Sequence, residues 1–404
     1  MRKSLQRRKI HGVVASQGAV QMVLLTQIPL IAEHCGLELA SIGGLVALGT
    51  FCLMIAGPAW GSLGDRIGRK SVVLAGLVGA LLAQCLFVVL LLGMALGHWD
   101  GSQAMPALMA SRVMYGLHAA AIYPGCQAWA VKSGDPARRL ATLSGLSAAA
   151  NLGRGLGPLL VLPALLLGDL WPLAWLIVLP LAALLLTMSL PSARAADKPA
   201  KTSLKAPLPP AALALFATAL LGTVSVGQLQ VVMGPVLQDL YGLSALGASS
   251  TAAVLLAAVA ICGFVVQVGL VRRLEAPQLS LILGVVSLGV GTLLLYTTLG
   301  GGAAAVGLLL FVVGTAFLVP GYSALLSQSG LRGGRLFGTL SMMHTGGYSI
   351  GFAAGGWLYQ QQPQESLLGL LVSVGLIAVC TGFALMPGWG SGRRRPADNR
   401  QAGQ

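Results

Sequence analysis

The sequence predicts an all-α polytopic membrane protein with twelve transmembrane helices in two six-helix halves related by pseudo-two-fold symmetry. The first observation is composition, because 56% of the 404 residues are hydrophobic and 9% are charged, whereas soluble proteins carry about 25% charged residues. The second is the length of the apolar runs, many of which reach the roughly 20 residues that a helix needs to cross a bilayer. The third is a repeat between the two halves of the chain.

Twelve helical spans are expected, separated by charged or Gly/Pro-rich breaks such as GDRIGRK, KSGDPARR and VRRLEAPQ. The basic N-terminus followed by an apolar run is similar to a signal peptide. That run is long and has no clear small-residue cleavage site, so it is assigned to the first span. The expected spans are about 11–32, 40–61, 71–97, 105–131, 141–167, 171–190, 209–234, 245–270, 279–299, 303–328, 336–358 and 367–387. The expected domains are residues 1–190, a linker at 191–208, residues 209–390 and a basic tail at 391–404.

Lysine and arginine residues set the expected orientation. All 25 except Arg112 and Arg154 fall in the N-terminal tail, the loops after even-numbered spans, the central linker or the C-terminal tail. These segments share one side of a twelve-span arrangement, and the positive-inside rule makes that side cytoplasmic. The protein is therefore expected in the inner (plasma) membrane, with both termini on its cytoplasmic side. The formal net charge of +14 is then a topogenic signal beside anionic lipid, so nucleic-acid binding is not expected.

The two halves match each other in sequence. Pro29 aligns with Pro235 and Arg66 with Arg272, and the segment YPGCQAWAVKSGDPARRLATLSG aligns with VPGYSALLSQSGLRGGRLFGTLS. Because both halves start on the same side of the membrane, the repeat is parallel. A substrate site is therefore expected between the halves, near the middle of the membrane.

Three segments resemble motifs of the major facilitator superfamily (MFS). GSLGDRIGRK between spans 2 and 3 resembles motif A, LMASRVMYGLHAAA in span 4 resembles motif B around Arg112, and GRGLGP in span 5 resembles the antiporter motif C. Tyr115 stands where motif B usually has glutamine, and Val161 and Leu162 replace the usual final glycine pair of motif C. The motif A residues are Gly61, Gly64, Asp65, Arg66, Gly68, Arg69 and Lys70, and the motif C residues are Gly153, Gly157 and Pro158.

The chain thus resembles a twelve-span drug:proton antiporter of that superfamily. The resemblance implies the MFS fold, and motif C implies export rather than uptake. It also implies that the arginine of span 4, Arg112, takes part in proton transfer. The glycines of the motif A segment permit a tight turn, and Asp65 can cap a helix end or pair with an arginine, so this loop is expected to latch the cytoplasmic helix ends.

Span 5 carries two stripes of residues at helical spacing. One stripe of small residues predicts close packing against another helix. The second, polar stripe lies roughly 100° around the helix and is expected to face the cavity. Arg154, about 20 Å from the start of the span, lies near mid-membrane, where a charge is expensive and marks a functional site. The small-residue stripe is Gly145, Ala149, Gly153 and Gly157, and the polar stripe is Ser147, Asn151, Arg154 and Pro158.

Other polar groups in or beside the spans are candidates for binding or proton coupling. Arg154 aligns with Ile350 and Arg112 with Leu308, so the charges are not duplicated in the second half, which suits a ligand held off the symmetry axis. The expected substrate-binding residues are Arg154, Arg112, Asn151, Ser147, Gln17, Gln21, Gln228 and His344. The expected proton-coupling residues are Arg112, Glu33, Asp239 and His118.

Structural alternatives stay open for these residues. Each arginine can pair with backbone carbonyl groups, and each intramembrane histidine can form a hydrogen bond between helices. Glu33 and Asp239, repeat mates at the outer ends of spans 1 and 7, can be ordinary interfacial charges.

Two deep cations and no deep carboxylate favour an anionic or zwitterionic solute, held by guanidinium–carboxylate pairing. A drug-like molecule or a siderophore-type metabolite fits this chemistry. We therefore expect a proton-coupled exporter that works by alternating access. An importer or exchanger of an organic anion is the alternative, and a non-transporting receptor or a membrane enzyme is a third.

Several classes of site are not expected. The sequence shows no Ser/His/Asp set, no metal-ligand spacing and no nucleotide loop, so neither an enzyme nor a metal site is predicted. No cofactor is expected besides the proton gradient. The expected partners are a small-molecule substrate and the lipid bilayer, and the protein is expected to be a monomer.

Overall fold

The computed structural model describes residues 2–133, 139–191, 209–274, 276–297, 302–329 and 333–386, and over these residues it contains helices and no strand. The linker expected at 191–208 lies outside the described residues except for Pro191, and so does the tail at 391–404. The first half contains α1 (Arg2–Thr26), α2 (Ile28–Cys35), α3 (Leu39–Ile67), α4 (Arg69–Ala95), α5 (Gly101–Ala119), α6 (Ile122–Ser133), α7 (Arg139–Leu165), the 3-10 helix η2 (Trp171–Ala174) and α8 (Trp175–Met188). The second half contains α9 (Pro210–Tyr241), α10 (Ala245–Gly269), the 3-10 helix η3 (Val271–Arg273), α11 (Pro277–Thr297), α12 (Gly302–Gln328), α13 (Gly333–Gln361) and α14 (Pro363–Leu385).

Within the described residues every predicted span is mainly helical, but two spans are broken. The first is divided into α1 and α2, which meet at an angle of 51° around Gln27. The fourth is divided into α5 and α6 by a turn at Ala120 and Ala121. Pro124 in the first turn of α6 has no N–H to donate, which favours a break there. Its repeat mate Pro320 lies inside the unbroken α12, so the proline alone does not cause the break.

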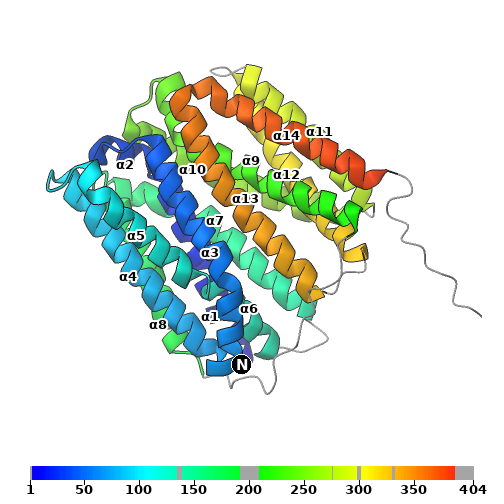
Figure 1. Cartoon of the computed structure of the whole chain (residues 1–404), viewed down its shortest axis with the longest axis horizontal. Helices are drawn as coiled ribbons and strands as arrows, with labels where there is room; N and C mark the ends of the chain where they lie inside the picture. The colour runs from blue at the N-terminus through cyan, green and yellow to red at the C-terminus, as the bar shows by residue number, and fades with distance from the viewer. Residues whose placement is uncertain are drawn as a thin grey trace, which may run out of the picture.

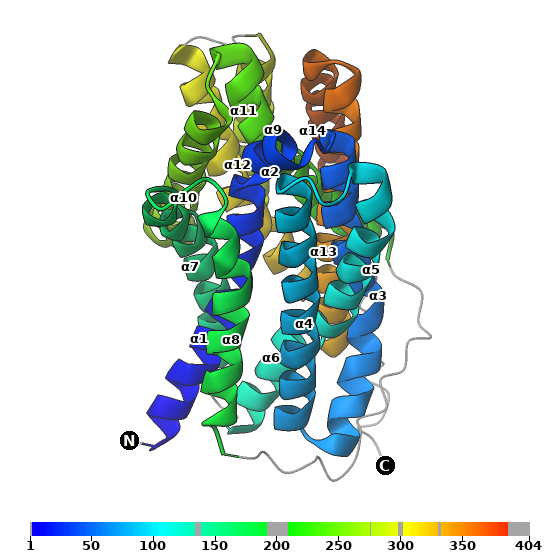
Figure 2. The same ribbon diagram turned by 90° about the vertical axis from the view of Figure 1, so that its left-hand side faces the viewer.

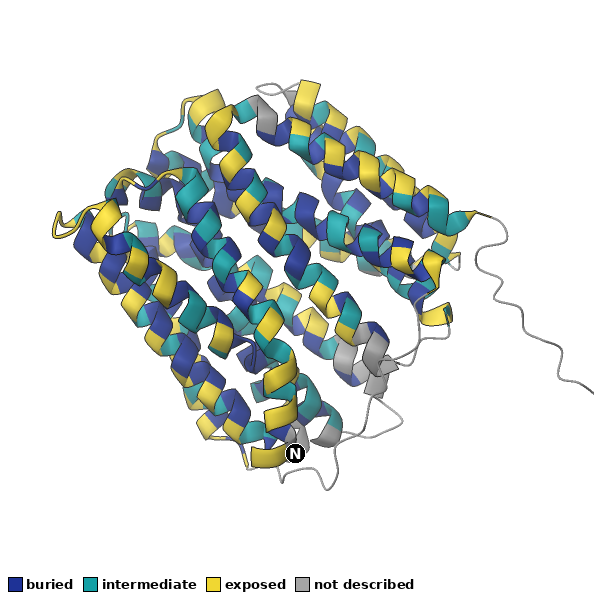
Figure 3. Ribbon diagram, in the orientation of Figure 1, coloured by how far each residue is buried: buried dark blue, intermediate teal, exposed yellow. Residues whose placement is uncertain are grey.

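The apolar helices make the chain a multi-pass membrane protein. Among the described residues, nine helices are long and apolar enough to cross a membrane, and the bent α1–α2 pair brings the number to ten. The α5–α6 pair and α13 lie outside this set, so the count of twelve crossings stays a prediction. Large apolar side chains are exposed along α4 and α11, including Val78, Leu82, Val89 and Val286. The ribbon coloured by burial shows exposed positions along the outer helices (Figure 3). Lipid rather than water suits such surfaces.

The two halves lie side by side (Figure 1), with α1–α8 in one and α9–α14 in the other. Helix α3 packs against α13, and α7 packs against α10, so these two pairs form the boundary between the halves. Helix α1 begins and α8 ends at one end of the bundle, which we call the near end (Figure 2). The opposite end, where α2 turns into α3 and α13 into α14, is called the far end.

Among the described residues, the hydrophobic core is shared by the two halves toward the far end. One cluster joins Leu24 and Ile28 of the first half to Val231 and Phe352 of the second. The cluster around Trp129 belongs to the first half, and the cluster around Leu281 belongs to the second. The halves therefore pack together through a common core at the far end, whereas each half has its own core toward the near end.

Candidate functional site

The polar stripe predicted on the fifth span lies along α7 and becomes more buried toward the far end. Ser147 and Asn151 are exposed, Arg154 is partly buried and Pro158 is buried. The hydroxyl groups of Ser147 and Tyr123 of α6 are 3.3 Å apart. Arg154 therefore lies at the inner limit of an exposed polar path that starts at the near end.

Arg154 makes its described contacts to an amide and an aromatic ring. Its Nη1 donates a hydrogen bond of 3.2 Å to Oδ1 of Asn151, one turn earlier in α7. Its Cζ is 5.9 Å from the centre of the Tyr348 ring in α13, across the boundary between the halves. Among the described side chains the ion pair found is His34–Asp169, and Arg154 has no carboxylate partner there. Its charge is thus available to an anionic ligand.

Helix α13 supplies the facing side of this site. His344 lies one turn before Tyr348, so the two side chains share a face of the helix. The Nε2 atom of His344 is 2.7 Å from the hydroxyl oxygen of Tyr322 in α12, a buried residue. Tyr348 stacks on Phe352 with ring centres 5.8 Å apart. Sequence reasoning missed Tyr322 and Tyr348, although the four-residue spacing between His344 and Tyr348 could have revealed the second.

The small-residue stripe of α7 lies against α1, as predicted. A Cβ atom on Gly153 would overlap the carbonyl oxygen of Ala15, and one on Gly157 would lie 2.6 Å from the carbonyl oxygen of Ala19. A Cβ on Gly18 of α1 would in turn overlap the carbonyl oxygen of Ala150. The close approach that the small residues predict is therefore confirmed. It holds α7 in one rotational setting and so turns Arg154 toward α13.

Arg112 lies elsewhere, buried inside the first half. Its side chain is 2% exposed, and Nη2 donates a hydrogen bond of 2.7 Å to Oε1 of Gln84 in α4. Its Cζ is 3.6 Å from the ring centre of Phe87 and 5.2 Å from that of Tyr115. The described contacts do not join Arg112 to Arg154. Its roles in substrate binding and proton transfer stay predictions.

The remaining predicted residues are spread over both halves. Gln17 and Gln21 are partly buried on α1, and Gln228 is buried with its Nε2 donating to the carbonyl oxygen of Ser366 inside the second half. His118 has Nδ1 2.8 Å from the carbonyl oxygen of Met114. At the far end Glu33 is exposed, and Asp239 accepts a hydrogen bond of 2.8 Å from the hydroxyl of Tyr359. The roles assigned to these residues stay predictions.

The motif A segment joins helices of the first half at the near end. Gly68 between α3 and α4 has φ 92°, a conformation that favours glycine. Arg69 Nη1 donates to the carbonyl oxygen of Gly61 at 3.5 Å, and Lys70 Nζ donates to the carbonyl oxygens of Met188, at 2.9 Å, and Leu190. Gly64 is buried and Arg66 is exposed. The side chain of Asp65 lies outside the described part of the chain, and its expected latch role stays a prediction.

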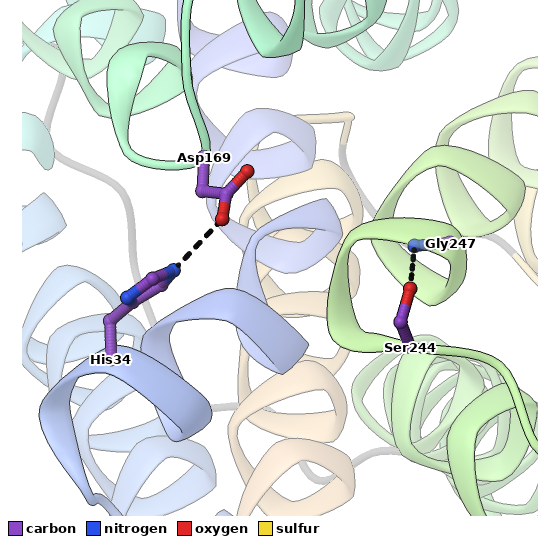
Figure 4. A network of polar contacts seen from close by, with 4 residues as sticks. All are labelled: His34, Asp169, Ser244 and Gly247. Atoms are coloured by element: carbon purple, nitrogen blue, oxygen red, sulfur yellow. Dashed lines mark hydrogen bonds and ion pairs between the residues drawn. The ribbon is translucent and has the colours of Figure 1, made fainter.

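The halves are tied together at the far end. Gln360 of α13 accepts from the backbone N–H of Ala40 at 3.2 Å and donates through Nε2 to the carboxylate of Glu38. Pro29 of α2 lies against Gly234 of α9. Nearby, His34 and Asp169 form an ion pair of 3.2 Å within the first half, and Ser244 caps α10 by accepting from the N–H of Gly247 at 3.1 Å (Figure 4).

Helices α3 and α13 are in close contact from the far end to about the middle of α3. A Cβ on Gly43 would lie 2.6 Å from the carbonyl oxygen of Phe352, and one on Gly346 would lie 3.0 Å from Sδ of Met54. Beyond Met54, toward the near end, a Cβ on Gly57 or Gly61 would meet no described atom within 4 Å. The α3–α13 boundary is therefore closed at the far end, and contacts fall away toward the near end.

Comparisons with known proteins agree with this architecture. The sequence model of the Major Facilitator Superfamily matches residues 11–333. The quinolone resistance protein NorA of Staphylococcus aureus is 29% identical over 136 residues, which are 34% of this chain and 32% of NorA. The match therefore spans about a third of that relative.

Two solved structures show the same fold. A mutant of the nucleoside transporter NupG superposes with a TM-score of 0.71 and 13% identity, covering 94% of this chain and 98% of NupG. The human organic anion transporter MFSD10 superposes with a TM-score of 0.66 and 16% identity, covering 95% of this chain and 100% of MFSD10.

Proposed function

The chain belongs to the major facilitator superfamily, and on that premise we propose that it exports a small anionic or zwitterionic organic solute by proton-coupled antiport. The family and its structural neighbours identify a transporter rather than an enzyme. The proposed solute is drug-like or of siderophore type. The near end is assigned to the cytoplasm, because the helix ends described there carry lysine and arginine residues such as Arg8, Arg66 and Lys70.

The position of Arg154 carries the proposal. It is a permanent cation at the inner limit of an exposed polar path, without a carboxylate partner among the described side chains. It faces the aromatic ring of Tyr348 in the other half. Arg154 lies at the boundary between the halves and its charge is not neutralised by a described carboxylate. Such a residue is suited to bind the carboxylate of a solute during alternating access.

The contacts between the halves support a state that is open to the cytoplasm. The far end is joined through Gln360, Pro29 and the shared core, and these contacts must break before a solute can leave on that side. A solute that enters from the near end reaches Ser147 and Asn151 before Arg154. The ordering suits loading from the cytoplasm and release outside.

The direction of transport rests on two further observations. The GP pair of α7, Gly157 and Pro158, resembles the antiporter motif. The printed name of NorA, a quinolone resistance protein, suits export, although the match covers a third of it. Uptake or exchange of an organic anion is the second candidate, and the human transporter MFSD10, which has the same fold, is named for solutes of that class.

The decisive experiment uses purified protein in proteoliposomes with an imposed pH gradient. Candidate organic anions and zwitterions are tested for movement against their own gradient and opposite to the proton flow. We expect Arg154→Ala to abolish this movement, whereas Arg8→Ala, which removes an exposed guanidinium near the N-terminus, leaves it intact. Unchanged transport by Arg154→Ala, or transport that survives full collapse of the proton gradient, contradicts the proposal.

A further inference from the structure

We propose that the solute is an aromatic zwitterion: its carboxylate binds Arg154, its ring lies against Tyr348 and its ammonium group donates a hydrogen bond to His344. A proton that binds His344 then replaces the ammonium group and expels the solute. This inference rests on the proposed function, because it assigns a substrate class and a proton-binding atom to the same site.

The three groups lie close enough for one small molecule to reach them all. Tyr348 is 5.9 Å, from ring centre to Cζ, from Arg154. His344 lies one helical turn from Tyr348, about 6 Å along the axis of α13. A benzene ring with a substituent at each end spans a gap of this size.

The aromatic part of the solute follows from Tyr348. This side chain is partly exposed and is braced by stacking on the buried ring of Phe352, with ring centres 5.8 Å apart and ring planes 26° apart. A braced ring beside a guanidinium is a suitable surface for a second ring, because offset-stacked aromatic pairs are favourable. The amide oxygen of Asn151 accepts a hydrogen bond from the same guanidinium.

The positive charge of the solute follows from the way proton binding and solute binding must affect each other in antiport. A purely anionic solute beside His344 would stabilise the protonated imidazole, so proton and anion would bind together and travel in one direction. Binding effects are reciprocal, so antiport requires each ligand to weaken the other. An ammonium group against His344 meets this requirement, because it repels a protonated imidazole and pairs with a neutral one.

The hydrogen bond to the Tyr322 hydroxyl determines which imidazole nitrogen of His344 exchanges the ammonium group for a proton. If Nε2–H of His344 donates to the Tyr322 oxygen, across 2.7 Å, the lone pair of Nδ1 is left as the acceptor. That lone pair takes either an N–H of the ammonium group or a proton, and never both. When the proton binds, the ammonium hydrogen bond breaks, the imidazole becomes a cation and the solute leaves with its own protons.

Among the described side chains, few other ionisable groups lie near His344. Tyr322 contacts it from α12, Arg154 of α7 faces the next turn of α13 at Tyr348, and Tyr348 lies on its own helix. Where α9 and α3 pack against this part of α13, they present Leu220, Thr223 and Met54, which do not titrate. The remaining ionisable side chains of the helices that pack against α13 are Asp239 and Tyr241 in the last turn of α9, Cys52, Asp65 and Arg66 in α3, and Glu365 and Cys380 in α14.

Isothermal titration calorimetry on the purified full-length chain tests this inference through the sign of proton exchange. Three matched probes are para-(aminomethyl)benzoate as zwitterion, para-methylbenzoate as anion and para-methylbenzylamine as cation. Titrations in buffers of different ionisation enthalpy count the protons released or taken up. We expect the zwitterion to bind about tenfold more tightly than either single-charge probe and to release protons on binding.

Variants separate the roles of the two residues. In His344→Gln the amide oxygen still accepts from the ammonium group but takes up no proton, so the zwitterion should bind with no proton release and with an affinity independent of pH. Arg154→Ala should weaken the zwitterion and the anion alike. His98→Gln, which changes an exposed histidine between α4 and α5, should bind and release protons as the parent does.

The outcomes distinguish this inference from the function on which it rests. Proton uptake on zwitterion binding, unchanged proton release in His344→Gln or absence of zwitterion binding overturns the inference. Tight binding of para-methylbenzoate alone, lost in Arg154→Ala, also overturns it but leaves a transporter of anions standing. The proposed export function itself is contradicted only by a negative result in the proteoliposome experiment.

Discussion

Ser349 in α13 donates its hydroxyl to the backbone carbonyl oxygen of Ala47 in α3, over 2.8 Å, so a buried hydrogen bond joins the two halves. In an apolar surrounding such a bond has no water to replace it, and breaking it leaves an unsatisfied carbonyl. The bond lies between the far-end contacts of Gln360 and the last contact at Met54. The α3–α13 boundary is therefore the surface that must open for the solute to leave at the far end.

We predict that Gly43→Ala shifts the protein toward far-end-open states. Its Cβ would lie 2.6 Å from the carbonyl oxygen of Phe352, so α3 and α13 must separate. Gly44→Ala is the matched control, because no described atom lies within 4 Å of its Cβ. The measurement is labelling of Ala40→Cys, a partly buried position at this boundary, by a membrane-impermeant maleimide, because this change leaves the side chains of Gln360 and Glu38 in place. Equal labelling in both glycine variants would show that the boundary tolerates the methyl group.

We predict that Gly153→Ala destabilises the fold by about 1–3 kcal/mol, the usual range for an overpacked core. The added methyl group would overlap the carbonyl oxygen of Ala15, and α1 and α7 would have to separate. Gly155→Ala on the same helix should be nearly neutral, since its Cβ would lie 3.4 Å from Cβ of Ala260. Thermal unfolding in detergent, followed by tryptophan fluorescence, measures both. Equal melting temperatures would contradict the close packing.

The two faces of α7, one of small residues and one polar, were predictable from the sequence, because helical periodicity places residues three or four positions apart on the same face. Small residues every four positions pack against α1, and the polar stripe reaches Arg154 with increasing burial. Partners on other helices were not predictable, because no local rule links Arg112 to Gln84 or Arg154 to Tyr348. These contacts depend on how helices are arranged.

The breaks in the first and fourth spans escaped prediction for a related reason. The apolar pattern continues through Gln27 and through Ala120, so periodicity alone gives one long helix in each place. Tertiary contacts decide the bend. Helix α2 reaches α9, where Pro29 meets Gly234, only because the chain turns by 51° after α1.

We predict that Gln84→Leu destabilises the protein by about 1–3 kcal/mol, because the buried guanidinium of Arg112 then loses its acceptor at 2.7 Å. Gln84→Glu keeps an acceptor at the same place and should retain more stability than the leucine variant. Thermal unfolding of the three proteins in one detergent decides the order. If the leucine variant is as stable as the parent, Arg112 has another partner.

We predict a pH-dependent N-cap at the start of α5. The Ser102 hydroxyl, at 2.6 Å, and the Gln103 N–H, at 2.9 Å, hold the pKa of Asp100 below its ordinary value. A depressed pKa means that the cap stabilises above the unfolded-state pKa and is lost as the pH falls through the folded-state pKa.

Hydrogen exchange at the Gln103 amide measures this effect against Asp100→Asn, whose side chain caps a helix at every pH. At neutral pH the two proteins should protect the amide similarly. At acid pH the parent should lose protection relative to the asparagine variant. A parallel response of both proteins would assign the low-pH change to some other group.

The far-end contact of Gln360 yields a prediction about gating. Gln360→Glu would place a second carboxylate against Glu38, where the amide Nε2 now donates, and would also remove that donor. Two like charges about 4 Å apart repel by about 1 kcal/mol even in water, which is roughly a fivefold shift in an equilibrium constant. We therefore expect Gln360→Glu to favour far-end-open states at neutral pH. The far end should close again on acidification, because protonated carboxyl groups no longer repel.

Gln361→Glu adds the same charge at the neighbouring exposed position and is the matched control. Distances between spin labels placed at the far ends of α3 and α13 measure the shift. Equal distance distributions in the two variants at neutral pH would show that the Glu38–Gln360 contact does not hold the far end closed.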